Sequence, residues 1–185
     1  YNTVKIGDQV WMAENLRTTA YYDGTAIPLE TDNNEWYNLT TPAYCWYYND
    51  SATYSAEYGV LYNWYAVITD NICPIGWHVS THSEWVTMIN YLGGISVAGA
   101  KLKEKGTTHW NNPNTGATNE SGFNGLPAGR RDPEFCTLGD FGNFWTSTQT
   151  SATHAWGHSL VNNAIYVCGG GYEKMNGYSV RCVKD

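Results

Sequence analysis

Residues 73–85 read CPIGWHVSTHSEW and combine a cysteine, a turn and the start of a helix. Pro74 and Gly76 favour a turn directly after Cys73. Thr81 and Glu84 have the spacing of a capping box, in which each side chain accepts a hydrogen bond from the backbone N–H of the other residue. The stretch therefore predicts a half-cystine and a tight turn, with a helix beginning a few residues later.

The helix that follows the capping box is predicted over residues 83–92. Four apolar side chains recur there at i, i+3, i+4 and i+7 and so share one face: Trp85, Met88, Ile89 and Leu92. The pair Gly93-Gly94 gives a C-terminal stop. A second short helix is predicted over residues 97–103. Its solvent side is expected to carry Lys101, Lys103 and Lys105.

The N-terminal part of the chain begins with a hairpin pattern. Residues 4–6 and 9–11 alternate on either side of Gly7-Asp8, which predicts a two-residue type II′ turn. Residues 20–56 follow as a polar, aromatic-rich stretch with weak periodicity. A stretch of this length without clear elements is usually functional or wrapped on the core.

The remainder of the chain predicts an antiparallel sheet after a long loop region. Residues 58–67 fit either an apolar strand or a short buried helix, and the pattern does not separate the two. Residues 106–142 are rich in Gly, Asn, Thr and Pro and have no period. Four strands are expected over residues 144–148, 155–160, 164–168 and 178–183. Gly169-Gly170-Gly171 is expected to be one of the connections. Helices segregated from one antiparallel sheet define an α+β fold.

The composition limits the classes of partner. The 185 residues are enough for one sizeable core and do not require a second domain, so residues 1–185 are read as a single domain. A net charge of −7 disfavours nucleic acids and anionic membranes, which both need basic surfaces. Only 15% of the residues are charged, whereas there are nine Trp and fifteen Tyr. Some of these rings are therefore expected on the surface, where Tyr and Trp serve recognition.

The same composition is typical of an exported bacterial protein. No apolar run reaches the 18 or so residues of a membrane span. The chain starts at Tyr1 directly in a strand pattern without a signal peptide, so a processed or trimmed product is expected. Localisation in the secreted fraction or at the cell surface is the expectation that follows.

The five cysteines fit reduced thiols, a metal cage or a disulfide framework. Zinc is disfavoured because no CxxC or CxxH pair occurs, and at least one disulfide is expected. If Cys73 bonds Cys182, the last strand is fixed to the entrance of the main helix, and closing a loop of roughly 110 residues stabilises the fold by about 4–5 kcal/mol. Cys136 and Cys168 are a second candidate pair. Cys45 is then free or bonded to another chain.

Several motifs together resemble the Fibrobacter succinogenes major paralogous domain, a family abundant in exported proteins of Bacteroidetes and Fibrobacteres. The motifs are VKIGDQVWMAENL (residues 4–16), YGVLYNW (58–64), CPIGWHV (73–79), SGFNGLPAGR (121–130), FWTST (144–148) and SVRC (179–182). The resemblance implies a C-type-lectin-like fold, a group that also contains formylglycine-generating enzymes. Two short helices packed on a small antiparallel sheet with a long-loop region, and an extracellular role, are then expected.

The resemblance also suggests two kinds of chemistry. Formylglycine-generating enzymes use two closely placed cysteines near the C-terminus as a redox or copper-binding pair. Here only Cys182 lies in such a position, so a structural bridge is the favoured reading. Sugar-binding C-type lectins hold Ca²⁺ with short Asn- and Asp-containing triplets. Trp110-Asn111-Asn112 is similar to one of them but differs in its third residue.

The loop around Trp110 is therefore a candidate binding region with two interpretations. Its oxygen-bearing side chains suit a hard cation such as Ca²⁺, or they simply shape turns. The residues concerned are Asn111, Asn114, Asn119 and Glu120. No metal site is assigned, and Ca²⁺ stays an open alternative.

The aromatic residues have three readings: sugar-stacking platforms, anchors of long loops on the core, or contacts between copies. The set is Trp36, Trp46, Tyr47, Tyr48, Trp110 and Trp156. Adjacent rings at residues 46–48 cannot all point inward from an extended segment. Trp46, Tyr48, Trp110 and Trp156 are the candidate binding residues of this set.

Three further features of the sequence bear on possible sites. Arg130-Arg131-Asp132 could hold an anionic group, although an Arg–carboxylate pair bracing the loop region is favoured. Arg130 is kept as a candidate binding residue. Asp50-Ser51-Ala52 resembles the O-glycosylation site of exported Bacteroidetes proteins and would place Ser51 on an exposed loop. The five histidines do not form an HExxH metal-binding motif. The sequence also lacks the Gly-x-Ser-x-Gly motif that would indicate a Ser-His-Asp catalytic triad.

The sequence thus predicts a secreted or cell-surface, non-enzymatic module that binds a glycan or a surface polymer and acts in adhesion. The second hypothesis is a self-assembling subunit of an extracellular filament or layer, with residues 1–6 as a strand donated between copies. A formylglycine-generating type of enzyme is the third and least favoured. No cofactor is expected.

Overall fold

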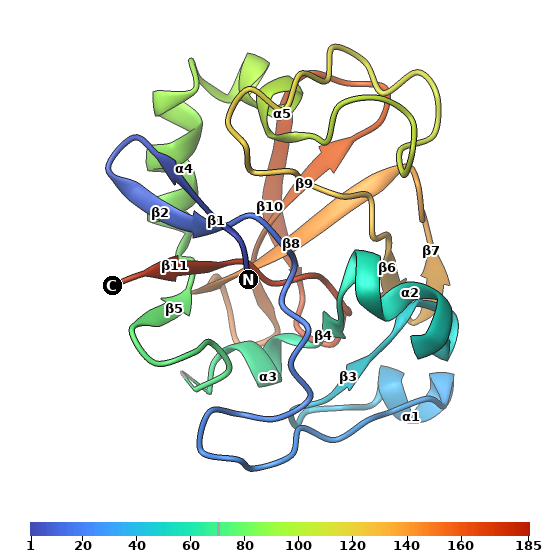
Figure 1. The fold of residues 1–185 in the computed structure, drawn as a ribbon. Coiled ribbons are helices and arrows are strands. Elements are labelled where there is room, and N and C mark those ends of the chain that lie inside the picture. Colours follow the sequence, from blue (N-terminus) through green and yellow to red (C-terminus); the bar gives the residue numbers. More distant parts are fainter. Residues whose placement is uncertain (70) are drawn as a thin grey trace.

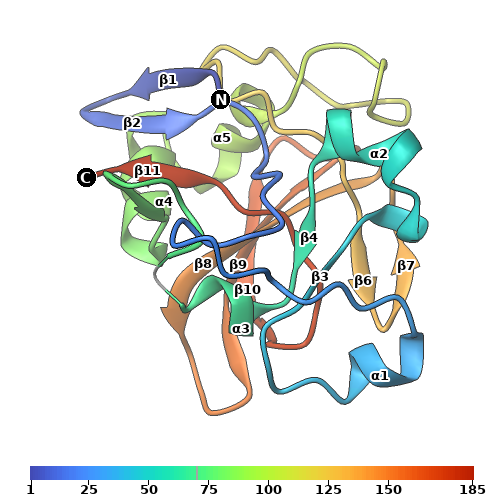
Figure 2. The same cartoon turned by 60° about the horizontal axis from the view of Figure 1, so that its bottom comes forward.

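A four-stranded antiparallel sheet joins the two ends of the chain (Figure 1). The computed structural model describes residues 1–69 and 71–185. The strands lie in the order β1 (Thr3–Ile6), β2 (Gln9–Met12), β11 (Cys182–Lys184) and β5 (Trp77–Val79). Gly7 has a φ of 61° in the predicted β1–β2 turn, a left-handed conformation that glycine adopts at no steric cost. Figure 2 shows β1 as the outermost strand of this sheet.

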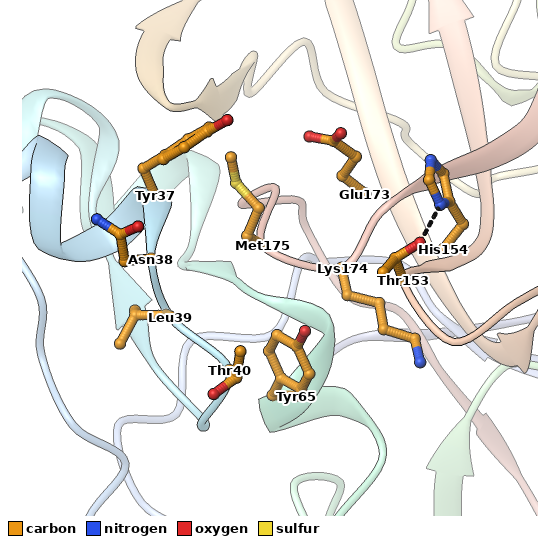
Figure 3. Close-up of a pocket in the computed structure, with 10 residues that line it drawn as sticks. All are labelled: Tyr37, Asn38, Leu39, Thr40, Tyr65, Thr153, His154, Glu173, Lys174 and Met175. Carbon is orange, nitrogen blue, oxygen red and sulfur yellow. Dashed lines mark hydrogen bonds between the residues drawn. The ribbon is translucent and has the colours of Figure 1, made fainter.

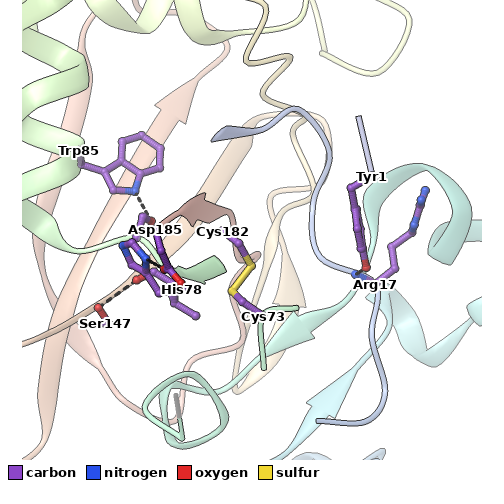
Figure 4. The surroundings of a disulfide bond; sticks show 10 residues. Tyr1, Arg17, Cys73, His78, Trp85, Ser147, Cys182 and Asp185 are labelled. Atoms are coloured by element: carbon purple, nitrogen blue, oxygen red, sulfur yellow. Dashed lines mark hydrogen bonds and ion pairs between the residues drawn. A yellow bond between two sulfur atoms is a disulfide. The ribbon is translucent and has the colours of Figure 1, made fainter. Parts of the chain in front are cut away.

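The predicted disulfide between Cys73 and Cys182 is confirmed (Figure 4). Cys182 is the cross-strand partner of Val79, so the bond ties β11 to the segment that leads into β5. His78, which precedes Val79 on β5, binds Asp185 through Nδ1 at 2.7 Å and Glu84 through Nε2 at 2.8 Å. The sheet, the covalent bond and the imidazole therefore fix the end of the chain to the start of the main helix.

The second predicted disulfide is wrong. Cys136, at the end of β7 (Glu134–Cys136), and Cys168, in β10 (Val167–Glu173), are free thiols. They belong to two different sheets. Cys45 is free and buried, and its burial raises the pKa of the thiol to about 12. Cys45 is therefore an unreactive core residue.

The main helix is α4 (His82–Tyr91), one residue earlier at each end than predicted. Its capping box is present in both directions, with Thr81 Oγ1 accepting from the Glu84 N–H and Glu84 Oε2 accepting from the Thr81 N–H. The second helix, α5 (Ile95–Leu102), is also confirmed and begins two residues earlier. Trp85, Met88 and Ile89 of α4 are buried in the core as the periodicity predicts.

A three-stranded antiparallel sheet carries much of the core. It consists of β8 (Phe141–Gln149), β9 (His154–Val161) and β10, in the order β10-β9-β8. The prediction that Gly169-Gly170-Gly171 is a connection is wrong, since these glycines form the middle of β10. Gly169 lies opposite His158, and a Cβ on it would stand 3.0 Å from His158 Nδ1, so the ring uses the space. The predicted strand over residues 178–183 forms a strand only at its end.

The expectation of just two helices is incomplete. Residues 20–67 contain three further short helices, α1 (Asn33–Tyr37), α2 (Ser51–Tyr58) and α3 (Trp64–Val67). Each starts at an Asx N-cap whose side chain accepts backbone N–H groups. The same region holds a 3-10 turn and two short strands, η1 (Tyr47–Asn49), β3 (Tyr44–Cys45) and β4 (Leu61–Tyr62). Residues 58–67, for which the pattern fits either a strand or a short helix, therefore contain one of each, β4 and α3.

Buried cations hold the long loop region to the sheets. The expectation that Lys103 faces solvent is wrong, because its side chain is fully buried. Its ammonium donates to three carbonyl oxygens, those of Thr115, Val161 and Ala164, at 2.8–3.0 Å. Burial lowers the pKa of Lys103 to about 8. Arg181 is fully buried and donates to oxygens of both the N-terminal segment and the loop: Asn15 Oδ1 and the carbonyls of Met12, Phe123 and Asn124. The loop is thus fixed in one conformation.

The described residues form an α+β arrangement in which α4 and α5 pack with the three-stranded sheet around one apolar cluster. Trp85, Phe123 and Phe144 are at its centre. A second cluster lies around Trp64, Trp145 and the disulfide. A small hairpin of β6 (Arg130–Asp132) and β7 packs near α1. In residues 1–69 and 71–185, no helix is long and apolar enough to cross a membrane.

Candidate functional site

A cleft of about 400 Å³ lies between the end of α1, helix α3 and the ends of β9 and β10 (Figure 3). We call it the α1–β10 cleft. The side chains that matter below are Tyr37, Asn38, Tyr65, His154, Glu173 and Met175. In Figure 3 the carboxylate of Glu173 points across the cleft toward Tyr37, while Met175 lies between them. The volume is within the usual range of ligand sites.

Tyr37 faces solvent because the residue before it is an anchor. Asp32 caps α1 by accepting from the N–H groups of Asn34 and Glu35. Trp36 is completely buried, so the next position on this one-and-a-half-turn helix points away from the core. Tyr37 is accordingly 57% exposed. An exposed aromatic ring at a fixed position is a platform on which a flat apolar face can stack.

Asn63 holds the opposite wall of the cleft. Its side chain is fully buried and binds three backbone groups, accepting from the N–H of Ala43 and Ala66 and donating to the carbonyl of Thr41. Asn63 thereby fixes the segment around Thr40 to the start of α3. Tyr65, the second residue of α3, lies half-buried at this junction and contributes a second ring to the cleft.

Lys174 lines the cleft, but its ammonium group binds other parts of the chain. Its ammonium lies 4.5 Å from the centre of the Trp64 ring and donates to the carbonyl of Ala152 at 2.8 Å. The Lys174 backbone N–H donates to Thr153 O, and its carbonyl accepts from the Trp64 N–H. The turn before β9, the end of β10 and α3 are therefore joined at one residue.

The polar groups that remain open to a ligand are neutral or anionic. Glu173 makes no ion pair among the residues that the structure describes, and its side chain is exposed. His154 Nδ1 bonds the hydroxyl of Thr153 at 2.9 Å, which leaves Nε2 toward the surroundings. Asn38 donates to Asn34 O and keeps its side-chain oxygen. Two rings with scattered hydrogen-bonding groups suit a neutral polyhydroxylated ligand.

The predicted binding residues are not brought together in this cleft. Trp110 is buried, and its indole N–H donates to Gly125 O, so it is a core anchor. Trp46 is partly buried against Tyr44 at a ring distance of 5.1 Å. Tyr48 is exposed at a positive φ of 51° and contacts Tyr47 and other rings. Trp156 lies in a second cavity that is described below.

The side chains of the candidate Ca²⁺ loop interact with other residues of the chain. Asn111 and Asn114 direct their amide nitrogens to Asp140 and to the carbonyls of Glu104 and Gly106. Asn119 accepts from the Asn124 N–H. Glu120 faces solvent near Lys101, with Oε1 and Nζ 3.5 Å apart. Within the described ranges, no group of three His, Cys, Asp or Glu residues could hold a metal ion. These residues shape the loop.

The expectation that a buried Arg–carboxylate pair of residues 130–132 braces the loop region is wrong, because the buried arginine holds the α1 region through other partners. Arg131 is fully buried and donates to the carbonyls of Glu30 and Thr31 and to Asn33 Oδ1, not to a carboxylate. Arg130 is half-buried, with its guanidinium 3.4 Å from Asp132. Ser51 is exposed, as expected, but it is the first residue of α2 and not part of a loop.

Sequence reasoning missed Tyr37, Tyr65 and Glu173. The signal for Tyr37 was its position directly after Trp36 in a short segment, where one ring must point inward and the next outward. No comparable signal marked Glu173. Its place in the cleft depends on the extension of β10 through three glycines, a run whose local sequence predicts a turn.

Comparison with known proteins gives one family. Residues 4–184 match the Fibrobacter succinogenes major domain. The chain belongs to this family. The search of curated proteins and the search of solved structures found no match. The match extends over nearly the whole chain and includes every residue that lines the α1–β10 cleft.

Proposed function

We propose that this chain is an extracellular, non-catalytic module that binds a neutral glycan or surface polysaccharide in the α1–β10 cleft and acts in adhesion. The observation that carries the proposal is the cleft itself, in which the exposed ring of Tyr37 faces Glu173 across a space of about 400 Å³. Sugars combine apolar ring faces with hydroxyl groups. The tyrosines offer stacking surfaces, and Asn38, His154 and Glu173 offer hydrogen bonds.

Two features support an extracellular location. Disulfides persist mainly in oxidising compartments, and the Cys73–Cys182 bond is buried in the core. The surface has few charges and many exposed tyrosines, including Tyr22, Tyr48 and Tyr91. This composition suits a protein that meets uncharged polymers more than one that meets nucleic acids.

The finer fold assignment and the lack of catalysis are part of the proposal. The C-type-lectin-like fold that the resemblance implies has two helices, a small antiparallel sheet and a long-loop region, and α4, α5 and the small antiparallel sheets support this assignment. Cys182 is the cysteine at the position that a formylglycine-generating enzyme would use. Its sulfur is bonded to Cys73 and is therefore not available as a thiolate nucleophile.

Self-assembly is the second candidate function, and β1 favours it. Residues 3–6 are paired with β2 in this chain, so they are not a free donor strand. However, β1 is the outermost strand of its sheet and offers its other edge to a second copy. Pairing of two β1 edges would extend the sheet across the two copies.

A glycan array measured with Ca²⁺ and with a chelator tests the first function. The chain is expected to bind neutral polysaccharides equally in both conditions, because the cleft needs no metal. A folded monomer that binds no glycan contradicts the proposal. Size-exclusion chromatography and negative-stain microscopy test the second function, since ordered polymers support assembly and discrete monomers exclude it under those conditions.

A further inference from the structure

A second cavity lies on the same two strands as the α1–β10 cleft. It measures about 320 Å³ and is more enclosed and more apolar than the cleft. Its walls come from α4, the start of α5, β9 and β10, and include His82, Val86, Asn90, Ile95, Trp156 and Gly169. We call it the Trp156 pocket.

The ring of Trp156 is held rigidly at the mouth of this pocket. It stacks on His82 with ring centroids 4.0 Å apart and planes inclined by 16°. His82 Nδ1 in turn lies 3.2 Å from His158 Nε2, and His158 stacks on the buried Trp85 at 4.8 Å. Trp156 itself stays partly accessible. A row of stacked rings therefore anchors one open indole to the core, and a ligand meets it without reordering it.

The Trp156 pocket and the α1–β10 cleft are adjacent along β9. His154 lines the cleft, whereas Trp156 and His158 line the pocket. Alternate residues of a strand share one face, so these three side chains lie on the same face of the sheet, with about 7 Å between successive members. The nearest residues of the two sites on β9, His154 and Trp156, are therefore only two positions apart in the strand.

The neighbouring strand β10 contributes small residues to the same face. In the regular β9–β10 register, Glu173, Gly171 and Gly169 lie opposite His154, Trp156 and His158. Glycine has no side chain, and the room at Gly171 is taken by Thr150, whose Oγ1 would lie 3.0 Å from a Cβ at that position. Glu173 belongs to the cleft and Gly169 to the pocket. The glycine run of β10 thus lets the exposed side chain of Thr150 and the ring of His158 pack close to the strand between the two cavities.

We infer that the Trp156 pocket is a second subsite for the same ligand, which makes the ligand a linear polysaccharide bound along its chain and not a single terminal sugar. This inference rests on the proposed function. Tyr37 and Glu173 contact one part of the chain. Trp156 stacks on a sugar farther along it, and Asn90 supplies a hydrogen-bonding amide at the pocket. Adjacent subsites make affinity increase with ligand length until both are filled.

Calorimetric titration with oligosaccharides of increasing length tests this inference. The probes are the β-1,4-glucan, β-1,4-xylan, β-1,4-mannan and α-1,4-glucan series, from dimer to hexamer. We expect wild-type affinity for the binding series to rise at least about tenfold from dimer to hexamer, which corresponds to one added subsite of about 1.4 kcal/mol. Trp156→Ala is expected to remove this gain and to leave the dimer affinity unchanged.

A second variant keeps the test independent of folding effects at the ring stack. Val86→Trp places a bulky side chain at the pocket from the exposed side of α4 and leaves His82, Trp156 and His158 intact. It should remove the same length-dependent gain, whereas Trp46→Ala, which changes a tryptophan outside both cavities, should not. Length-independent binding that Tyr37→Ala abolishes overturns this inference alone. Absence of binding in all four series overturns the proposed function as well.

Discussion

The guanidinium of Arg131 lies over the indole of Trp36, with Cζ 4.4 Å from the ring centre, and this pair fixes the end of α1. Arg131 also binds the backbone of Glu30 and Thr31, which precede the helix. Trp36 is buried beneath it and Tyr37 is turned outward as a result. A residue of the β6–β7 hairpin therefore positions the exposed ring of the α1–β10 cleft, about a hundred positions away in sequence.

Replacement of Arg131 by Met should destabilise the fold and weaken ligand binding together. The substitution leaves the carbonyls of Glu30, Thr31 and Pro133 without their donor in a buried site, at a cost of about 3 kcal/mol in the free energy of unfolding. Urea denaturation measures this loss. Arg130→Met removes a half-exposed arginine and is the control, with an expected change below about 1 kcal/mol. Equal effects of the two variants would contradict the role assigned to Arg131.

Loss of the disulfide should have a large effect on stability. The bond between Cys73 and Cys182 closes a loop with a sequence separation of 109. The double substitution Cys73→Ser and Cys182→Ser is expected to lower the free energy of unfolding by about 4–5 kcal/mol, because the unfolded chain regains conformational entropy. Cys136→Ser, which changes a free and half-buried thiol, is the matched control. The expectation fails if reduction of the wild type leaves its urea midpoint unchanged.

Acidification should destabilise the protein through His158. Burial, followed by the nearby His82, lowers the pKa of His158 from 6.5 to about 4. The unfolded state then binds more protons than the folded state between these values, so stability is complete above pH 6.5 and is lost as the pH falls toward 4. The loss attributable to this residue is roughly 3 kcal/mol. His158→Phe keeps a ring beside Trp85 and should flatten the slope of unfolding free energy against pH in this range. An unchanged slope contradicts the assignment.

His78 should act in the opposite direction. Burial lowers its pKa, but the hydrogen bonds and charges of Asp185 and Glu84 outweigh burial and raise it above 6.5. The folded state therefore binds the proton more tightly, and this contribution is present below pH 6.5 and is lost as the pH rises through the folded pKa. NMR titration of the imidazole in wild type and in Asp185→Asn measures the effect. A lower pKa in the variant is expected, and an equal pKa would remove Asp185 as its cause.

The elements that could be predicted from the sequence are those with a local or covalent signal. The capping box at Thr81 and Glu84 identifies the start of α4, because both partners are three residues apart. The disulfide follows from one cysteine beside the turn and another in the last strand. By contrast, α1, α2 and α3 are four to eight residues long, too short for a helical period, and are stabilised by Asx caps and tertiary contacts.

The candidate site could not be predicted in the same way. Trp110 and Tyr37 have the same local appearance, an aromatic residue in a polar stretch, yet one is buried and the other exposed. The difference arises from distant partners, Gly125 for Trp110 and Arg131 for the segment of Tyr37. The glycines of β10 have their role only beside His158 and Trp156, which the sequence does not place next to them.

The binding of neutral polysaccharide by Tyr37→Ala, compared with Tyr22→Ala, tests the central claim most directly. Both tyrosines are 57% exposed, so either truncation is tolerated by the fold to a similar degree, but only Tyr37 lines the α1–β10 cleft. Affinity electrophoresis should show a roughly five- to tenfold weaker interaction for Tyr37→Ala, since a stacked ring contributes on the order of 1–1.5 kcal/mol. Tyr22→Ala should migrate as the wild type does. Equal retardation of wild type, Tyr37→Ala and Tyr22→Ala would contradict the account.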